Sequence, residues 1–209
     1  LDTNARQSNS QIAKKVGLSS EVVHYRIKRL EEERIITQYQ LIANLSALGI
    51  LQFKICLDLQ HMSSEKLKEI IDKLKKNNSV KWIVSSRGGW DLLIALEADS
   101  MERIDALKNE VLSMFSGHIN KKAISVLIEA STYGRDYLVE EKRKVKKERA
   151  IMKENKKIKI DELDVKILKH LAENARKSIV DIAHELKTTE RIVNYRIKQM
   201  IKNKIILGF

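Results

Sequence analysis

The chain has 209 residues, and its 40 lysines and arginines exceed its 28 aspartates and glutamates, which gives a formal net charge of +12. This excess favours a polyanionic partner, either nucleic acid or an anionic membrane surface, although a solvated basic surface has the same composition. The single cysteine, Cys56, excludes an intrachain disulfide framework, and no apolar run reaches membrane-spanning length. We therefore expect a cytoplasmic protein with no membrane partner.

Residues 1–49 have the pattern of a helix–turn–helix followed by a wing. A small Ala13, Gly17 four residues later and Val23 six residues beyond match the spacing of this motif, because alanine lets two helices approach closely and glycine forms the tight turn. The β-rich run RIITQY at 34–39 predicts the first strand of the wing. The expected inner faces of the two helices carry Ile12, Ala13, Val16, Val23, Ile27 and Leu30.

The second of these helices has an outward face suited to duplex DNA. At 100° per residue, Tyr25 and Lys28 point away from the buried stripe. Such a helix can enter a major groove, with its N-terminal residues at base edges and its basic residues at phosphates. The alternative is an ordinary amphipathic helix that packs on a partner protein. The candidate DNA contacts in this copy are Ser19, Ser20, Glu21, His24, Tyr25 and Lys28.

Residues 50–132 predict a ferredoxin-like βαββαβ unit. LQFKICLDLQ at 51–60 alternates strictly, 63–78 has helical periodicity, and VKWIVSS and WDLLIALEA flank the hairpin signal at Gly88-Gly89. A capping box at 99–102 opens a second helix, and AISVLIEA alternates again. We expect one strand to place Val80, Trp82 and Val84 on the same face.

The sheet of this unit has one face that its two helices leave open. Apolar residues on that face need a cover, and a second copy of the chain can supply it. We therefore expect a homodimer or higher homo-oligomer through the ferredoxin-like domain.

The stretch at 140–159, EEKRKVKKERAIMKENKKIK, holds ten lysines and arginines and four glutamates. It predicts a basic connector, either a solvated linker or a semi-rigid helical spacer. A contact between this connector and DNA phosphates is the sharper alternative.

Residues 160–209 repeat the first copy at a constant offset of 170 residues. Asn4-Ala5-Arg6 falls on Asn174-Ala175-Arg176, and Tyr25-Arg26-Ile27-Lys28 falls on Tyr195-Arg196-Ile197-Lys198, without a gap. Chance does not hold one register over about forty residues. The second copy has a leading helix after Asp161 whose counterpart would precede Leu1, so we expect the chain to be cut from a longer duplicated plan.

The second copy has its own set of candidate DNA contacts. Its turn, at 186–189, has no glycine and is expected to be strained or differently shaped. The candidates in this copy are Thr188, Thr189, Arg191, Asn194, Tyr195 and Lys198.

NARQSNSQIAKKVGLSSEVVHYRIKRLEEERIITQY, followed by NLSALGI, resembles the DNA-binding part of the Lrp/AsnC (leucine-responsive regulatory protein) transcription factors, and RGGWDLLIALEA resembles their amino-acid-sensing RAM domain. The resemblance implies a dimeric or higher regulator that binds promoter DNA and senses a small metabolite, often an amino acid. In that family effectors bind between sensing domains near the glycine-containing hairpin, which Gly88, Gly89 and Asp91 match here. Two features depart from the family plan: Arg34 replaces the usual glycine before the wing strand, and one chain carries two DNA-binding units.

Motifs for catalysis or metal binding are missing from the sequence. The five histidines are scattered, and there is no phosphate-cradling loop, nucleophile elbow or paired-carboxylate motif. We therefore expect no enzyme activity, no catalytic or metal-binding residues and no cofactor.

The sequence predicts an α+β protein with a winged helix–turn–helix at 1–49, a ferredoxin-like RAM-type sensor domain at 50–132, a basic connector at 133–159 and a second helix–turn–helix at 160–209. The predicted function is a sequence-specific, double-stranded-DNA-binding transcriptional regulator, modulated by an amino acid or other small metabolite at the sensor-domain interface. The alternative is an oligomeric protein-interaction or amino-acid-binding module whose helix–turn–helix units do not bind DNA.

Overall fold

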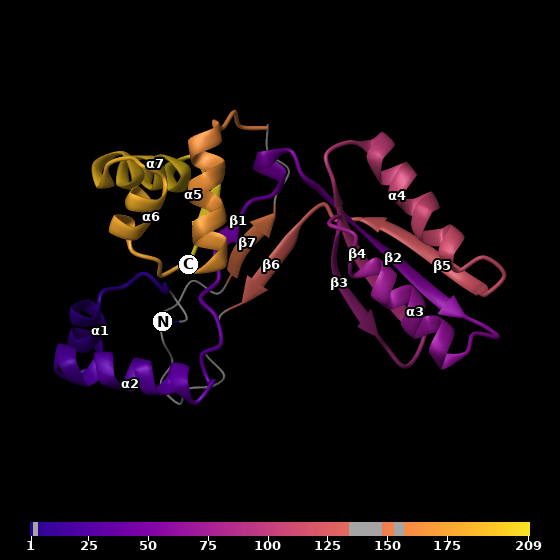
Figure 1. The fold of residues 1–209 in the computed structure, drawn as a ribbon, viewed down its shortest axis with the longest axis horizontal. Coiled ribbons are helices and arrows are strands. Elements are labelled where there is room, and N and C mark those ends of the chain that lie inside the picture. Colours follow the sequence, from indigo (N-terminus) through magenta and orange to yellow (C-terminus); the bar gives the residue numbers. More distant parts are fainter. Residues whose placement is uncertain (2–3, 134–147, 153–156) are drawn as a thin grey trace. The chain divides into compact units, whose positions relative to one another are not determined.

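The computed structural model describes residues 1, 4–133, 148–152 and 157–209, which form two compact units (Figure 1). Of the described residues, 1, 4–44, 130–133, 148–152 and 158–209 belong to the helical unit, and 45–129 with 157 belong to the sheet unit. The two helix–turn–helix copies, which the sequence predicts as separate domains, thus fall in one unit. Within the described residues no helix is long and apolar enough to cross a membrane.

The first helix–turn–helix consists of α1, Asn9–Val16, and α2, Ser20–Glu32. Ser8 and Gln11 form a capping box at the start of α1, in which the Ser8 hydroxyl accepts a hydrogen bond from the Gln11 N–H at 3.2 Å. Gly17 ends the helix in the left-handed conformation. The residues that hold the two helices together are the predicted Ala13, Val23 and Ile27.

The second helix–turn–helix consists of α5, Glu162–Glu173, α6, Ile179–Glu185, and α7, Glu190–Lys202. Asp161 caps α5, and Arg196 of α7 reaches the same end of that helix. The Arg196 Nη1 lies 2.7 Å from Asp161 Oδ2 and 3.3 Å from Asp164 Oδ2. The buried apolar residues of this copy include Ile167, Leu171, Ile182, Val193 and Ile197.

The turn of the second copy keeps the conformation of the first without a glycine. Lys187, which the offset of 170 relates to Gly17, has a φ of 51°, beside 67° for Gly17. Arg34 and Lys204, which the same offset relates, both have a φ of 56°. Because a side chain in the left-handed region costs about 1–2 kcal/mol, the turn at Lys187 is strained rather than differently shaped.

The predicted wing strand at 34–39 is wrong. The strand that follows α2 is β1, Ile42–Ala43, and it pairs antiparallel with β8, Ile206–Gly208, at the end of the second copy. The Tyr39 carbonyl instead accepts a hydrogen bond from the Ala175 N–H at 2.9 Å. Contacts with the second copy therefore override the local β propensity.

Part of the predicted connector is a strand. β7, Glu148–Met152, pairs antiparallel with β6, Ala130–Tyr133. An unpaired linker and a helical spacer are therefore both wrong for 148–152, because these residues pair with another strand. The local sequence did not indicate this partner strand. Residues 134–147 and 153–156 lie outside the described part of the chain.

The sheet unit has the predicted ferredoxin-like fold. Its four strands are all paired antiparallel in the order β3-β4-β2-β5, and α3 and α4 pack on one face (Figure 1). A 3₁₀ turn at Ser46–Leu48 precedes the sheet. The bounds are β2 Leu51–Leu59, α3 Ser64–Leu74, β3 Val80–Ser85, β4 Leu92–Ala98, α4 Met101–Met114 and β5 Ile119–Val126.

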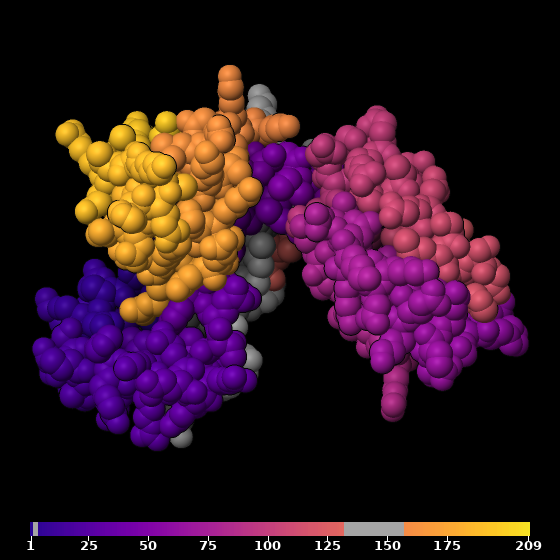
Figure 2. All heavy atoms as spheres, viewed as in Figure 1, coloured from indigo at the N-terminus to yellow at the C-terminus, as the bar shows by residue number. Residues whose placement is uncertain are grey.

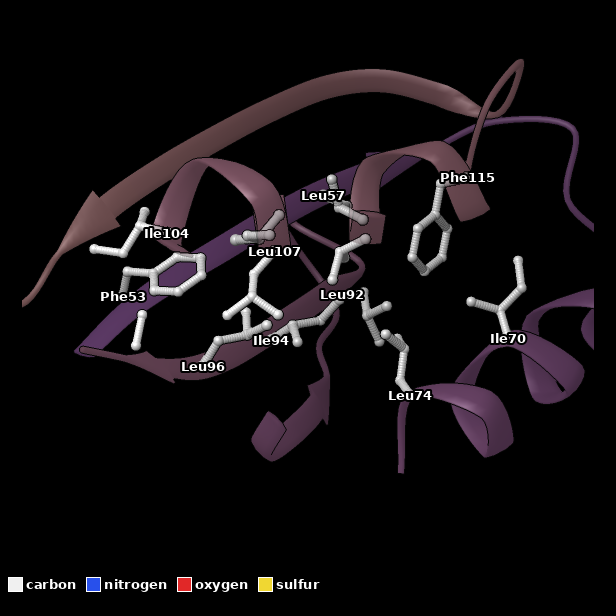
Figure 3. Packing of buried hydrophobic residues seen from close by; sticks show 13 residues of the cluster. Phe53, Leu57, Ile70, Leu74, Leu92, Ile94, Leu96, Ile104, Leu107 and Phe115 are labelled. Carbon is white, nitrogen blue, oxygen red and sulfur yellow. The ribbon is translucent and has the colours of Figure 1, made fainter. Parts of the chain in front are cut away.

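The core of this unit lies between the sheet and its two helices. Phe53 and Leu57 project from one face of β2 into a cluster that also contains Leu74 of α3 and Leu107 of α4, and none of these four residues is exposed to solvent (Figure 3). The strict alternation of 51–60 is the sequence counterpart of this arrangement, since successive residues of a strand point to opposite faces.

One strand departs from its predicted alternation. A bulge lies between Val80 and Trp82 in the pairing of β3 with β4. It adds one residue to β3, so the side chains after it point to the opposite face of the sheet from the one that strict alternation predicts. Val80 and Ile83 therefore pack against the core, whereas Trp82 and Val84 lie on the opposite face and are exposed. The prediction that Val80, Trp82 and Val84 share a face is wrong for Val80.

Candidate nucleic-acid interface

α2 presents a polar and aromatic face to solvent because its apolar residues anchor the opposite side. Val23 and Ile27 are buried, whereas Tyr25 between them is 66% exposed. The Ser19 hydroxyl caps the helix by accepting a hydrogen bond from the Val22 N–H at 3.2 Å. The first turn of α2 is thus fixed in place and accessible to a partner.

α7 repeats this arrangement in the second copy. Val193 and Ile197 are buried, and Tyr195 is 59% exposed. The Thr189 hydroxyl accepts a hydrogen bond from the Ile192 N–H at 3.3 Å. A tyrosine ring in solvent adds little to a folded core, so core packing does not explain its recurrence at one helix position.

The first turns of the two helices differ in charge. Hydrogen bonds from its own backbone N–H and from Ser19 hold the pKa of Glu21 below its usual value, so the start of α2 carries a carboxylate. The equivalent residue of α7 is Arg191, which is exposed. The two first turns therefore differ in the sign of their charge and in hydrogen bonding, because a carboxylate accepts hydrogen bonds whereas arginine donates them.

Two further residues of α2 are positioned by exposed contacts. The Lys28 Nζ lies 3.7 Å from Glu32 Oε1, and such a solvated pair is weak, so Lys28 can exchange this partner for a phosphate. The His24 Nδ1 accepts a hydrogen bond from the Asn9 side-chain amide at 3.4 Å. This bond connects the exposed face of α2 to α1.

The structure places all twelve predicted DNA contacts on α2 and α7 or in the two residues before each helix, and all are at least partly exposed. They are Ser19, Ser20, Glu21, His24, Tyr25, Lys28, Thr188, Thr189, Arg191, Asn194, Tyr195 and Lys198.

The predicted effector residues lie in the connection between β3 and β4. Gly88 has a φ of 139°, and a Cβ added at Gly88 or Gly89 would meet no atom within 4 Å, so the backbone there is open. Asp91 Oδ2 accepts a hydrogen bond from the Leu59 N–H at 2.7 Å, and the Asp91 N–H donates to the Leu57 carbonyl at 2.9 Å. The Asp91 side chain therefore fastens the connection to β2, which sequence reasoning did not anticipate.

Metal-binding side chains are dispersed over the described part of the chain. In that part no group of three or more His, Cys, Asp and Glu residues is arranged to hold a metal ion. Cys56 is half-buried in β2 and carries a free thiol.

Sequence reasoning assigned no role to Arg6 and Arg176. The guanidinium carbon of Arg6 lies 5.5 Å from the ring centroid of Phe209, and that of Arg176 lies 5.2 Å from the ring centroid of Tyr39. The signal was present, because both arginines and both aromatic residues match at the offset of 170. The repeat alone did not indicate that each arginine contacts the aromatic ring of the other copy.

The chain matches two models of helix–turn–helix families. Residues 1–37 match a winged helix-turn-helix DNA-binding model, and residues 160–201 match an AsnC-type helix-turn-helix domain. An uncharacterised HTH-type transcriptional regulator of Pyrococcus furiosus is 31% identical over 119 residues, which are 56% of this chain and 79% of the relative. The HTH-type transcriptional regulator LrpA of Pyrococcus horikoshii is 33% identical over 113 residues, which are 53% of this chain and 78% of the relative.

Solved structures share the fold at lower identity. A Neisseria meningitidis transcriptional regulator in complex with L-Met superposes with a TM-score of 0.54 at 18% identity, over 64% of this chain and 89% of its own. The siroheme decarboxylase NirDL, in complex with an iron-uroporphyrin III analogue, superposes with a TM-score of 0.63 at 13% identity, over 97% of this chain and 58% of its own. The likeness to both is one of fold. With two matching helix–turn–helix models and relatives above 30% identity that are regulators, the chain belongs to the Lrp/AsnC family of DNA-binding transcriptional regulators.

Proposed function

We propose that α2 and α7 are the two recognition helices of this regulator and that each enters a DNA major groove. The observation that carries the proposal is the exposed tyrosine and lysine at the same helix positions in both copies, Tyr25 and Lys28 in α2, Tyr195 and Lys198 in α7. Buried residues on the opposite side of each helix hold these side chains outward. A helix anchored in this way fits a groove.

The side chains divide into two roles. Lys28 and Lys198 neutralise phosphates, which supplies affinity without base discrimination. Base edges are read by residues of the first two turns, which are Glu21 and His24 in α2 and, at the equivalent positions of α7, Arg191 and Asn194. The hydroxyls that complete the set, at the helix starts and in the turn before them, are Ser19, Ser20, Thr188 and Thr189.

Charge reversal at the two lysines tests this assignment. Lys28→Glu and Lys198→Glu each place a carboxylate next to a phosphate, so we expect at least about a tenfold loss of duplex affinity at 100 mM salt and a shallower salt dependence. The control is Lys68→Glu, which changes the net charge equally at an exposed position of α3 in the sheet unit. Equal losses for all three variants, or a flat salt response of the wild type, would favour the alternative that the helix–turn–helix units hold proteins.

We further propose that a second copy covers the open sheet face and that an amino acid binds beside the connection with Gly88 and Gly89. Trp82 and Val84 lie exposed on that face, and the Lys54 Nζ lies 5.4 Å from the Trp82 ring. A related fold in the Neisseria regulator holds L-Met. Calorimetry with the twenty amino acids, repeated on Gly89→Val, tests the ligand, because a bulky side chain there blocks backbone approach.

We infer that the protein acts as a regulator in the cytoplasm and not as an enzyme. Its relatives above 30% identity are transcriptional regulators, and the decarboxylase likeness concerns the fold. Incubation with siroheme followed by absorption spectroscopy is the direct check, and turnover would refute the inference.

A further inference from the structure

The two helix–turn–helix copies contact each other through matching backbone groups. The Ala5 N–H donates to the Phe209 carbonyl at 3.0 Å, and the Ala175 N–H donates to the Tyr39 carbonyl at 2.9 Å. The offset of 170 relates Ala5 to Ala175 and Tyr39 to Phe209. The second hydrogen bond is therefore the first one with the two copies exchanged.

Two side-chain contacts obey the same exchange, whereas the hydrogen bonds of the Arg6 Nη1 have no counterpart at the Arg176 Nη1. Arg6 lies over the ring of Phe209, and Arg176 lies over the ring of Tyr39. Contacts that recur when two partners are exchanged define an isologous interface, which has two-fold symmetry. The two copies are thus related by a local pseudo-two-fold axis inside one chain. Figure 2 shows the indigo atoms of the first copy against the orange atoms of the second.

Further contacts fasten this pair. The Arg6 Nη1 donates to the carbonyls of Ala175 at 2.7 Å and of Lys177 at 2.9 Å. Burial, and then the neighbouring positive charge of Arg176, lower the pKa of Arg6. The backbone carbonyls that accept from Arg6, and the aromatic rings under both arginines, therefore stabilise two positive charges near the axis. The antiparallel pairing of β1 with β8 adds backbone bonds across the copies.

One contact connects the pair to a recognition helix. The Arg176 Nη2 donates to Asn9 Oδ1 at 3.3 Å, and the Asn9 amide donates to the His24 ring of α2 at 3.4 Å. His24 is one of the proposed base contacts. The direction of the first recognition surface is therefore linked to the second copy.

We propose that a single chain binds a bipartite duplex whose two half-sites are inverted, unlike in sequence and set at one separation. The two-fold relation gives α7 and α2 opposite orientations on the duplex, so the half-sites run in opposite directions. The first-turn residues differ between the helices, so the preferred bases differ. The contacts across the axis fix the separation. This inference rests on the proposed function of α2 and α7.

The first test uses the wild-type protein. Bound duplexes are selected from a random library, and the spacing between the two recovered half-sites is then varied from 1 to about 10 inserted base pairs. We expect affinity to fall at least about tenfold near a half-turn insertion, to recover partly near a full turn, and to fall when one half-site is reversed. Equal affinity at all spacings and orientations would overturn the inference and leave the proposed function intact. Absence of salt-dependent binding to every duplex would instead overturn the proposed function, and the inference with it.

The second test asks whether the two helices act in one chain. Lys28→Glu and Lys198→Glu are co-expressed with different tags, and complexes that contain both variants are isolated. If one chain spans the bipartite site, the mixed complexes bind no better than either variant alone. Recovery to within about fourfold of wild-type affinity would show that the half-sites are shared between chains, and would overturn the inference.

The third test loosens the pair without touching the DNA contacts. Arg6→Ala removes the two hydrogen bonds and the ring contact that the Arg6 side chain makes across the axis, and Arg6→Lys keeps the charge but not the planar guanidinium. Both should reduce the preference for the best spacing to under about threefold, with less than about a twofold change on an isolated half-site. Arg103→Ala on α4 is the charge-matched control. An unchanged spacing preference in a folded Arg6→Lys protein would refute the role of this contact, even if Arg6→Ala does not fold.

Discussion

The glycine that one turn has and the other lacks allows a prediction with an internal control. Gly17 and Lys187 occupy the same left-handed position of the two turns, with φ of 67° and 51°. A Cβ added at Gly17 would meet no atom within 4 Å, so Gly17→Ala changes the backbone energy and not the packing. We expect this substitution to lower the free energy of unfolding by about 1–2 kcal/mol.

Lys187→Gly should act in the opposite direction. It relieves a similar conformational cost, but the unfolded chain gains freedom at the new glycine, so the expected net gain is about 0.5–1 kcal/mol. Urea denaturation followed by far-UV circular dichroism measures both changes, with midpoint shifts of about 0.3–1 M. Both tryptophans, Trp82 and Trp90, lie in the sheet unit, so their fluorescence serves as the control and should not shift. Midpoint shifts of the same sign for the two variants would refute the strain argument.

Two further predictions concern the core and the pH dependence. Phe53→Ala removes a ring with no solvent exposure from the sheet-unit core, and we expect a loss of about 3–5 kcal/mol in the tryptophan-monitored transition; a loss below 1 kcal/mol would contradict the packing in Figure 3. Burial and then the hydrogen bond to Glu31 raise the pKa of Tyr39 to about 12, above the usual value of 10.0. The folded state thus holds this proton more tightly, so the contribution is complete below pH 10 and is lost between pH 10 and 12. Tyr39→Phe should flatten the stability profile in that window, and an identical profile for both proteins would contradict the assignment.

The parts of the fold that the sequence predicts are those whose signal is local. The alternation of 51–60 and the helical period of 63–78 reflect burial against one core, and each segment carries its own pattern. The helix caps Ser19 and Asp161 are likewise readable, because capping depends on residues a few positions away. The candidate DNA contacts follow from the same helical geometry, since the buried stripe defines the opposite face.

The wrong predictions arise where pairing with a strand elsewhere in the sequence determines the local structure. The strand after α2 is β1, which pairs with β8 more than 160 residues later. The sequence at 34–39 does not indicate that this partner shifts the strand to later residues. The bulge after Val80 reverses the facing of β3 without any change in apolar character. In each case the local pattern is compatible with two structures, and a tertiary hydrogen bond selects one.

The repeated Tyr-Arg-Ile-Lys shows that identical residues need not have identical roles. In α7 the arginine, Arg196, is 34% exposed and is held by Asp161 and Asp164 at the start of α5. Its guanidinium stabilises the second helix–turn–helix and is not free to neutralise a phosphate. Lys198, two residues later, is exposed on the other side of the helix. We therefore expect Arg196→Ala to destabilise the second copy and Lys198→Ala to weaken DNA binding at unchanged stability. Circular dichroism and duplex titration on the two variants separate these roles, and a reversed outcome would show that the arginine, and not the lysine, faces the DNA.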